Sequence, residues 1–342
     1  MNHADEVSNS FDSDRLSERR AERRLNRRNF LTGIGAAGAA AALAGCSSNG
    51  QPMTMGGTGT TTYTDTDILN FALNLEYLEA EFYLHASTGS GLASADAGSS
   101  PGTVTGGAQV TGLTSTQQNI LNEIAYDEQE HVRFLRSALG SAAVARPAID
   151  LTNSFNALAS AAGIASTFNP FGSFDAFVVG AFIFEDVGVT AYAGAAPLIS
   201  TAGITAGYLA AAAGIMAVEA YHAAYVRTYL TAQAIASSSY AYLTYANKVS
   251  TLRATLGGGN ETALTVPTGT APFTNSTIPT ASSIVAATSA NAIAYARTTD
   301  QVLHIVYGSL SNTSGATASA AGVAKGAFFP NGLNGNITVT QS

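Results

Sequence analysis

Apolar residues recur every three or four positions through most of the chain beyond residue 64, and this spacing is typical of amphipathic helices. The first such segment, about 65–87, has its apolar positions at Ile68, Phe71, Leu75, Leu78 and Phe82. A capping box at Ser115-Thr-Gln-Gln118 predicts a second helix that ends at Gly140. The same pattern predicts further helices at about 172–198, 202–235, 239–256 and 281–308. Because few stretches alternate with a period of two, we expect an all-α fold.

Segments rich in Gly, Ser and Thr separate these helices and indicate how the chain is organised. Residues 87–112 and 257–280 have this composition and are predicted to be long loops, whereas 141–170 is a mixed crossover. We expect a helical bundle over 65–256. Residues 257–342 are predicted to form a loop, a helix and a tail packed on the bundle. Residues 47–64 lack periodicity, which predicts a flexible tether.

The first 46 residues have the composition of an export signal. Seven of the fifteen Lys and Arg residues lie within positions 1–28, and an apolar stretch follows at 33–43. The pair Arg27-Arg28 resembles a twin-arginine signal, and Leu43-Ala-Gly-Cys46 resembles a bacterial lipobox. We therefore expect export to the periplasm or cell surface, with a lipid on Cys46 as the membrane anchor. The alternative is an ordinary signal cut after Ala44, which would leave Cys46 as a free thiol.

The composition of the chain excludes several classes of function. Charged residues make up only 11% of the chain, against about 25% in an average globular protein. The net charge of −8 argues against nucleic acid as a partner. A single cysteine excludes an internal disulfide framework and any Cys-x-x-Cys zinc or redox site. With so few charges, each carboxylate inside a predicted helix becomes a candidate for chemistry.

An internal repeat carries the candidate chemistry. The second and fourth predicted helices each contain a Glu-x-x-His motif, at Glu128-Gln-Glu-His131 and Glu219-Ala-Tyr-His222. The first and third helices each contain a Glu with a Tyr seven positions later, namely Glu76 with Tyr83 and Glu185 with Tyr192. Residues three apart lie on one face of a helix, so each motif can direct a carboxylate and an imidazole at the same point.

This order of motifs is the one that a dinuclear metal site in a four-helix bundle requires: a Glu from each of two helices and a Glu-x-x-His from each of the others. Four carboxylates in a bundle core would repel each other, and two divalent cations would balance their charge. Oxygen and imidazole ligands favour iron or manganese, and a metal pair with open positions can bind O2 or peroxide. We therefore predict two Fe or two Mn ions.

Three segments resemble the ferritin-like superfamily of di-iron and di-manganese carboxylate proteins, in particular the exported group that includes plant desiccation-related proteins. They are Leu75-Glu-Tyr-Leu-Glu-Ala-Glu-Phe-Tyr83, Tyr126-Asp-Glu-Gln-Glu-His131 and Phe329-Pro-Asn-Gly-Leu-Asn-Gly335. The resemblance implies a ferritin-like four-helix bundle with extra C-terminal helices and loops. It also implies six metal ligands, namely Glu76, Glu128, His131, Glu185, Glu219 and His222.

The chain departs from this family in the residues that would support the ligands. Many members have an Asp two residues after each His, where this sequence has Arg133 and Ala224. Asp127 and Asp186 are the candidates to take over that role.

The first helix offers three glutamates, and the repeat selects one. Only Glu76 has a carboxylate counterpart in the second half, because Glu79 corresponds to Gly188 and Glu81 to Thr190. Glu79 is the alternative ligand. Tyr83 and Tyr192 are candidates for hydrogen bonds to ligands or for electron transfer, and the alternative is core packing. Arg136 and Arg227 are expected to pair with carboxylates at the bundle end, and His85 and His304 to be structural.

Three functions remain open. The first is a redox enzyme whose metal pair reacts with peroxide or O2 in oxidative or desiccation stress. The second is ferroxidase or another iron-handling activity with Fe(II) as substrate, and the third is a non-enzymatic stress protein with a vestigial site. Since no cysteine-ligated iron domain can supply electrons, catalase-like dismutation of peroxide fits the first function. The oligomeric state stays open, and an oligomer is possible.

Overall fold

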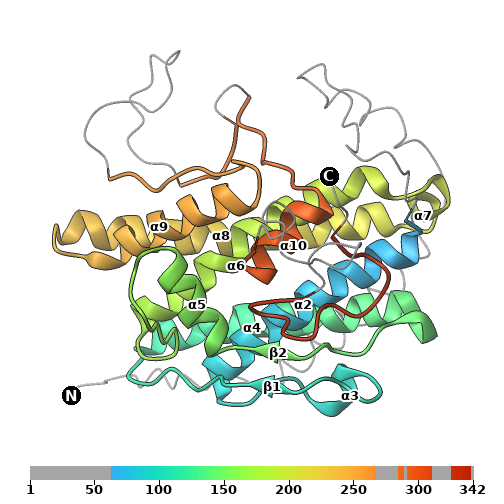
Figure 1. The fold of residues 1–342 in the computed structure, drawn as a ribbon, viewed down its shortest axis with the longest axis horizontal. Helices are drawn as coiled ribbons and strands as arrows, with labels where there is room; N and C mark the ends of the chain where they lie inside the picture. Colours follow the sequence, from blue (N-terminus) through green and yellow to red (C-terminus); the bar gives the residue numbers. More distant parts are fainter. Residues whose placement is uncertain (1–62, 267–283, 289–290, 310–324, 340–342) are drawn as a thin grey trace, which may run out of the picture.

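The computed structural model describes residues 63–266, 284–288, 291–309 and 325–339. Its framework consists of four long helices: α2 (Asp65–Thr88), α4 (Ser115–Leu139), α6 (Phe174–Ala195) and α8 (Tyr208–Ala236). Helix α2 packs mainly on α4 and α6 mainly on α8, while α2 and α6 also contact each other (Figure 1). The predicted all-α bundle is confirmed. The predicted export signal and nearly all of the predicted tether lie outside the described residues.

Local capping fixes the ends of the first two long helices. At the start of α2, the Thr64 hydroxyl accepts from the amide of Asp67 (3.2 Å), and the Asp67 carboxylate accepts from the amide of Thr64 (2.9 Å). Helix α4 begins with the same reciprocal pair, Thr114 and Gln117, one residue before the predicted capping box. Gly140 follows α4 with a φ of 57°, a conformation that glycine adopts readily.

Aromatic side chains form the centre of the core. The ring of Phe82 on α2 lies 5.4 Å from Phe177 and 5.2 Å from Phe184 on α6, and Phe184 in turn meets Phe328 of the C-terminal tail at 4.9 Å. By length and composition alone, α6 and α8 are both apolar enough to cross a membrane. In the structure 94% of the α6 span is buried inside the protein, against 28% for α8. Helix α6 is therefore the core helix of this bundle.

Short elements connect the long helices. They are α3 (Ser94–Ala97), β1 (Val104–Thr105), β2 (Ile149–Asp150), α5 (Asn153–Ala161) and α7 (Thr201–Thr205), with 3-10 turns at Gly140–Ala142 and Ala196–Leu198. Strands β1 and β2 pair in parallel and join the first long loop to the crossover. Helix α5 was not predicted, although it buries Phe155 and Leu158. The predicted helix at 202–235 is broken at Gly207, whose φ of 88° separates α7 from α8.

The C-terminal part contains α9 (Ala241–Leu256), close to its predicted bounds, and α10 (Thr299–Tyr307). The predicted helix over 281–308 is confirmed only in its last part, α10, and its predicted start was wrong, because the described residues between 284 and 298 are not helical. Ala287 and Ala294 form an antiparallel bridge, and Ala292 between them has a φ of 54°. The amide of Arg297 donates to the carbonyl of Thr190 on α6 (3.0 Å). These tertiary contacts outweigh the local periodicity, and the helix begins only after the cap at Thr298.

Candidate metal centre

The bundle brings the six predicted ligand side chains to one place. Glu76 comes from α2, Glu128 and His131 from α4, Glu185 from α6, and Glu219 and His222 from α8. None of the six is more than 8% exposed. Most charged side chains are buried only when they are paired or bind a metal, so this cluster requires a chemical explanation.

The six side chains form two overlapping groups, each of which could hold a metal ion. One group is Glu76, Glu128, His131 and Glu219, and the other is Glu128, Glu185, Glu219 and His222. Within each group the candidate ligand atoms all lie within 4.8 Å of one another. Both groups share Glu128 and Glu219, so these two carboxylates can bridge two ions. The first group is completed by Glu76 and His131, and the second by Glu185 and His222.

Both imidazoles present the same nitrogen to the centre. Nδ1 of His131 lies 3.1 Å from Glu76 Oε2 and 3.3 Å from Glu128 Oε2. Nδ1 of His222 lies 3.0 Å from Glu128 Oε1 and 3.5 Å from Glu185 Oε2. The Glu-x-x-His spacing places both imidazoles in this way, because it stacks the two side chains on one helix face.

Several polar atoms in the cluster have no hydrogen-bond partner among the described residues. They are Oε1 of Glu128, Oε2 of Glu185, both carboxylate oxygens of Glu219 and Nδ1 of His222. His222 Nδ1 and Glu128 Oε1 are close, yet their orientation is not that of a hydrogen bond. Buried polar atoms without partners are costly. Clustered oxygen and imidazole donors of this kind fit metal ions.

The electrostatics of the cluster also call for positive charge. Burial, together with the neighbouring carboxylates Glu128, Glu76 and Glu185, raises the pKa of Glu219 well above its usual value. Burial opposes charging of the imidazoles, but the surrounding glutamates raise the pKa of both His131 and His222. The cluster therefore favours bound positive charge, which either protons or cations can supply.

The two tyrosines reach across the bundle to carboxylates of the opposite pair of helices. The hydroxyl of Tyr83 on α2 donates to Glu185 on α6, and the hydroxyl of Tyr192 on α6 donates to Glu76 on α2. Both tyrosines are buried. A tyrosine on α2 thus orients Glu185 on α6, and a tyrosine on α6 orients Glu76 on α2.

Of the two aspartates expected to support the ligands, one does so. Asp127 Oδ2 lies 3.4 Å from Nε2 of His222, on the side of the ring away from the centre. This contact favours a proton on Nε2 and leaves Nδ1 free as a ligand. Asp186 points elsewhere, since it pairs with Arg227 (2.8 Å) and Arg253 (2.9 Å).

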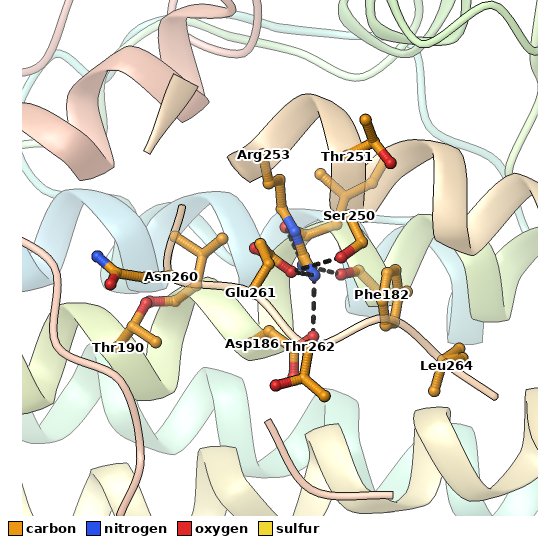
Figure 2. A network of polar contacts seen from close by, with 12 residues as sticks. Phe182, Asp186, Thr190, Ser250, Thr251, Arg253, Asn260, Glu261, Thr262 and Leu264 are labelled. Carbon is orange, nitrogen blue, oxygen red and sulfur yellow. Dashed lines mark hydrogen bonds and ion pairs between the residues drawn. The ribbon is translucent and has the colours of Figure 1, made fainter. Parts of the chain in front are cut away.

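Asp186 belongs to a buried charge network between α6, α9 and the segment that follows α9, which Figure 2 shows in part. Arg253 binds Asp186 and, at 2.8 Å, Glu261, and its guanidinium lies over the ring of Phe182. Arg297 completes the network through Glu261 (2.6 Å). This network of Arg253, Glu261 and Arg297 has no signal in the sequence, because Asp186 and Arg297 lie far along the chain from Arg253 and Glu261.

The predicted pairing of Arg227 with a carboxylate is confirmed by its contact with Asp186. For Arg136 the prediction was wrong, because its guanidinium donates to the Tyr77 hydroxyl (2.6 Å) and to a backbone carbonyl. His85 lies outside both groups and has a glutamate one turn earlier, Glu81, at 3.4 Å. Glu81 in turn pairs with Arg146.

Glu79 is buried at 6% exposure but belongs to neither group. A Cβ added at Gly188 would lie 2.4 Å from Glu219 Oε2 and 3.5 Å from Glu79 Oε1, so Glu79 borders the cluster. Burial and the charges of Glu219 and Glu128 raise the pKa of Glu79 well above its usual value. Glu76 thus lies in one of the two groups and Glu79 in neither, and Glu76 as the ligand stays a prediction.

Comparison with known proteins gives this architecture a family. Residues 64–232 match the family described as the ferritin-like domain. The chain is 30% identical over 283 residues to a protein named ferritin-like catalase Nec2 from Nesocodon mauritianus, an alignment that covers 80% of this chain and 84% of that protein. It is 29% identical over 204 residues to desiccation-related protein PCC13-62 from Craterostigma plantagineum, with coverage of 57% and 63%. The chain belongs to the ferritin-like family.

Proposed function

We propose that Glu76, Glu128, His131, Glu185, Glu219 and His222 hold two iron or two manganese ions. The observation that carries this proposal is that the two candidate groups share Glu128 and Glu219. Four carboxylates supply a charge of −4, which two divalent cations balance, and two neutral imidazoles complete the ligand set. The cations would also give partners to the buried oxygens of Glu185 and Glu219.

We further propose that this centre dismutates hydrogen peroxide. One peroxide is reduced to two waters and a second is oxidised to O2, so two electrons and two protons pass between them and no outside donor is needed. A bound metal pair would supply the redox cycle that stores these two electrons between the half-reactions. The single cysteine supports this choice, because no cysteine-based electron relay can be built from it. The relative named ferritin-like catalase supports it as well.

The residues around the ligands have definable tasks in this function. Tyr192 and Tyr83 donate to Glu76 and Glu185 and so leave the second oxygen of each carboxylate to face the centre. Asp127 keeps the proton of His222 on Nε2. The apolar core around Phe82 and Phe184 excludes bulk water from this side of the centre. Each tyrosine hydroxyl also places its proton next to the carboxylate that it contacts.

The test is metal analysis of the purified protein followed by measurement of O2 release from hydrogen peroxide. The manganese-loaded and iron-loaded forms are compared side by side, without added reductant. We expect two ions per chain and O2 release from at least one form. Rapid Fe(II) oxidation without O2 release would replace this function by ferroxidase activity. Bound metal with neither activity would favour a non-enzymatic stress protein.

We propose that the reaction takes place outside the cytoplasm. The support is the sequence alone: the basic segment with Arg27-Arg28, the apolar stretch at 33–43, and Cys46 after Leu-Ala-Gly. A lipid on Cys46 would hold the bundle at a membrane surface. Transport through a twin-arginine pathway would deliver the protein folded and already loaded with metal.

A further inference from the structure

A small cavity lies directly beside the candidate metal centre. It has a volume of about 10 Å³, and its walls come from α2, α6, α10 and Phe328 of the tail. A space of this size holds at most one molecule close to water in size. Nine of its ten lining residues are apolar or glycine, and the only polar one is Glu79.

Gly188 connects this cavity to the ligands. It lines the cavity, and a Cβ added to it would lie 2.4 Å from Oε2 of Glu219 and 3.5 Å from Oε1 of Glu79. The space above Gly188 is thus bordered by a bridging ligand on one side and by Glu79 on the other. A molecule in the cavity would therefore lie beside Glu79 and Glu219.

One carboxyl oxygen of Glu79 receives no hydrogen bond from the described residues. This oxygen, Oε2, is buried. The whole residue is only 6% exposed, so bulk water does not supply a donor either. An acceptor in this state costs free energy that a bound donor would recover. The apolar residues around it supply no donor.

We propose that Glu79 and this cavity form the binding subsite for the peroxide substrate, an inference that rests on the proposed function. Hydrogen peroxide is neutral, has two non-hydrogen atoms and can donate a hydrogen bond to the unpartnered oxygen of the Glu79 carboxyl group. Dioxygen has no donor to offer Glu79. A hydrated Fe(II) ion would lose its waters against apolar walls. Phe328 and Ile305 close the cavity, which gives the C-terminal region a part in substrate selection.

The first experiment tests the role of Glu79 in the metal-loaded protein. Glu79→Leu should retain two ions per chain and raise the KM for hydrogen peroxide about tenfold, because a hydrogen bond to a buried acceptor is lost. Glu79→Gln, which retains an acceptor oxygen, should lie between Glu79→Leu and the wild type. Loss of metal in Glu79→Leu would show that Glu79 is a ligand, and an unchanged KM would show that it does not touch the substrate. Either result overturns the inference.

The second experiment tests the walls by size. Phe328→Ala is compared with Phe329→Ala, since both side chains are fully buried neighbours and only Phe328 lines the cavity. Tert-butanol, at a concentration that leaves the wild type unaffected, should raise the apparent KM for peroxide at least threefold in Phe328→Ala and leave Phe329→Ala unchanged. If Phe328→Ala does not fold, Ile305→Ala takes its place. Equal sensitivity of the two phenylalanine variants would overturn the inference.

A third readout does not depend on activity. Crystals of the metal-loaded protein are soaked in methanol, which has two non-hydrogen atoms and one hydroxyl donor. We expect methanol or water within hydrogen-bond distance of Glu79 in the wild type, and neither in Glu79→Leu. An empty wild-type cavity overturns the subsite, whereas a wild-type protein that consumes no peroxide overturns the proposed function, so the two failures are distinguishable.

Discussion

The sharing of Glu128 and Glu219 between the two groups predicts how many ions each variant should lose. Glu76 belongs to one group only, so Glu76→Ala removes one ligand from one ion and leaves the other four-residue group intact. Glu219 belongs to both groups, so Glu219→Ala leaves each ion with three protein ligands. We therefore expect about one ion per chain in Glu76→Ala and close to none in Glu219→Ala.

The magnitude follows from the burial of the ligands. Glu76 and Glu219 are 2% and 1% exposed, so water replaces neither carboxylate easily. Removing one partner from a buried charged contact costs about 3–5 kcal/mol, and each 1.4 kcal/mol is a factor of about ten, so the Kd should rise by roughly two to three and a half orders of magnitude per affected ion. Glu79→Ala is the matched control, because Glu79 is also buried, at 6% exposure, on the same helix as Glu76 and belongs to neither group.

The assay is elemental analysis after gel filtration, followed by calorimetric titration of the metal-free protein. Metal content should fall in the order wild type and Glu79→Ala, then Glu76→Ala, then Glu219→Ala. A Glu76→Ala protein without any metal would show that the ions do not bind independently to the two groups. One full ion retained by Glu219→Ala would refute the bridging arrangement, and greater loss in Glu79→Ala than in Glu76→Ala would show that the internal repeat misidentified the ligand.

Three further predictions concern stability and export. Arg253→Met should lower the free energy of unfolding by about 3–5 kcal/mol, because it strips buried acids of a partner, whereas the control Arg133→Met, at an exposed pair, should cost at most about 1 kcal/mol in a denaturant titration. Because the pKa of Glu219 is raised, the metal-free fold favours the protonated form of this residue, and the Tm of the metal-free protein should fall as pH rises above about 4.5. Bound metal should abolish this trend. A Tm of the metal-free protein that does not change with pH would contradict the prediction. Replacing Arg27-Arg28 by Lys-Lys should block export, and Cys46→Ser should release the protein from membranes; fractionation that finds either variant distributed like the wild type would refute the corresponding part.

The six cluster residues could be predicted because the information is local. Glu128 and His131 share a helix face by spacing alone, and the order of the four motifs along the chain specifies which helices must meet. Partners across the bundle could not be predicted in the same way. The repeat places Tyr83 and Tyr192 near the ligands, but which carboxylate each one meets depends on how the helices are paired.

The largest errors fall where tertiary contacts override the local pattern. Residues upstream of Thr298 have helical periodicity, yet Arg297 extends to α6 and to Glu261 instead. The buried position of Arg253 is likewise unexpected from sequence, since arginine is rarely buried unless it is paired. Its partners Asp186 and Glu261 become neighbours only after α6, α9 and the following segment are assembled.

The crossed tyrosine–glutamate contacts have a consequence for how such a centre can diverge. The hairpins α2–α4 and α6–α8 each contribute a Glu, a Tyr and a Glu-x-x-His, so two identical hairpins related by a twofold axis would build a centre of this kind. Two identical hairpins would carry the same residue at every equivalent position, and both faces of the centre would then be alike. A single fused chain is free of that constraint, and this one has Glu79 where the other hairpin has Gly188. Fusion thereby allows two equivalent positions beside one metal centre to differ, with a carboxyl group at Glu79 and no side chain at Gly188.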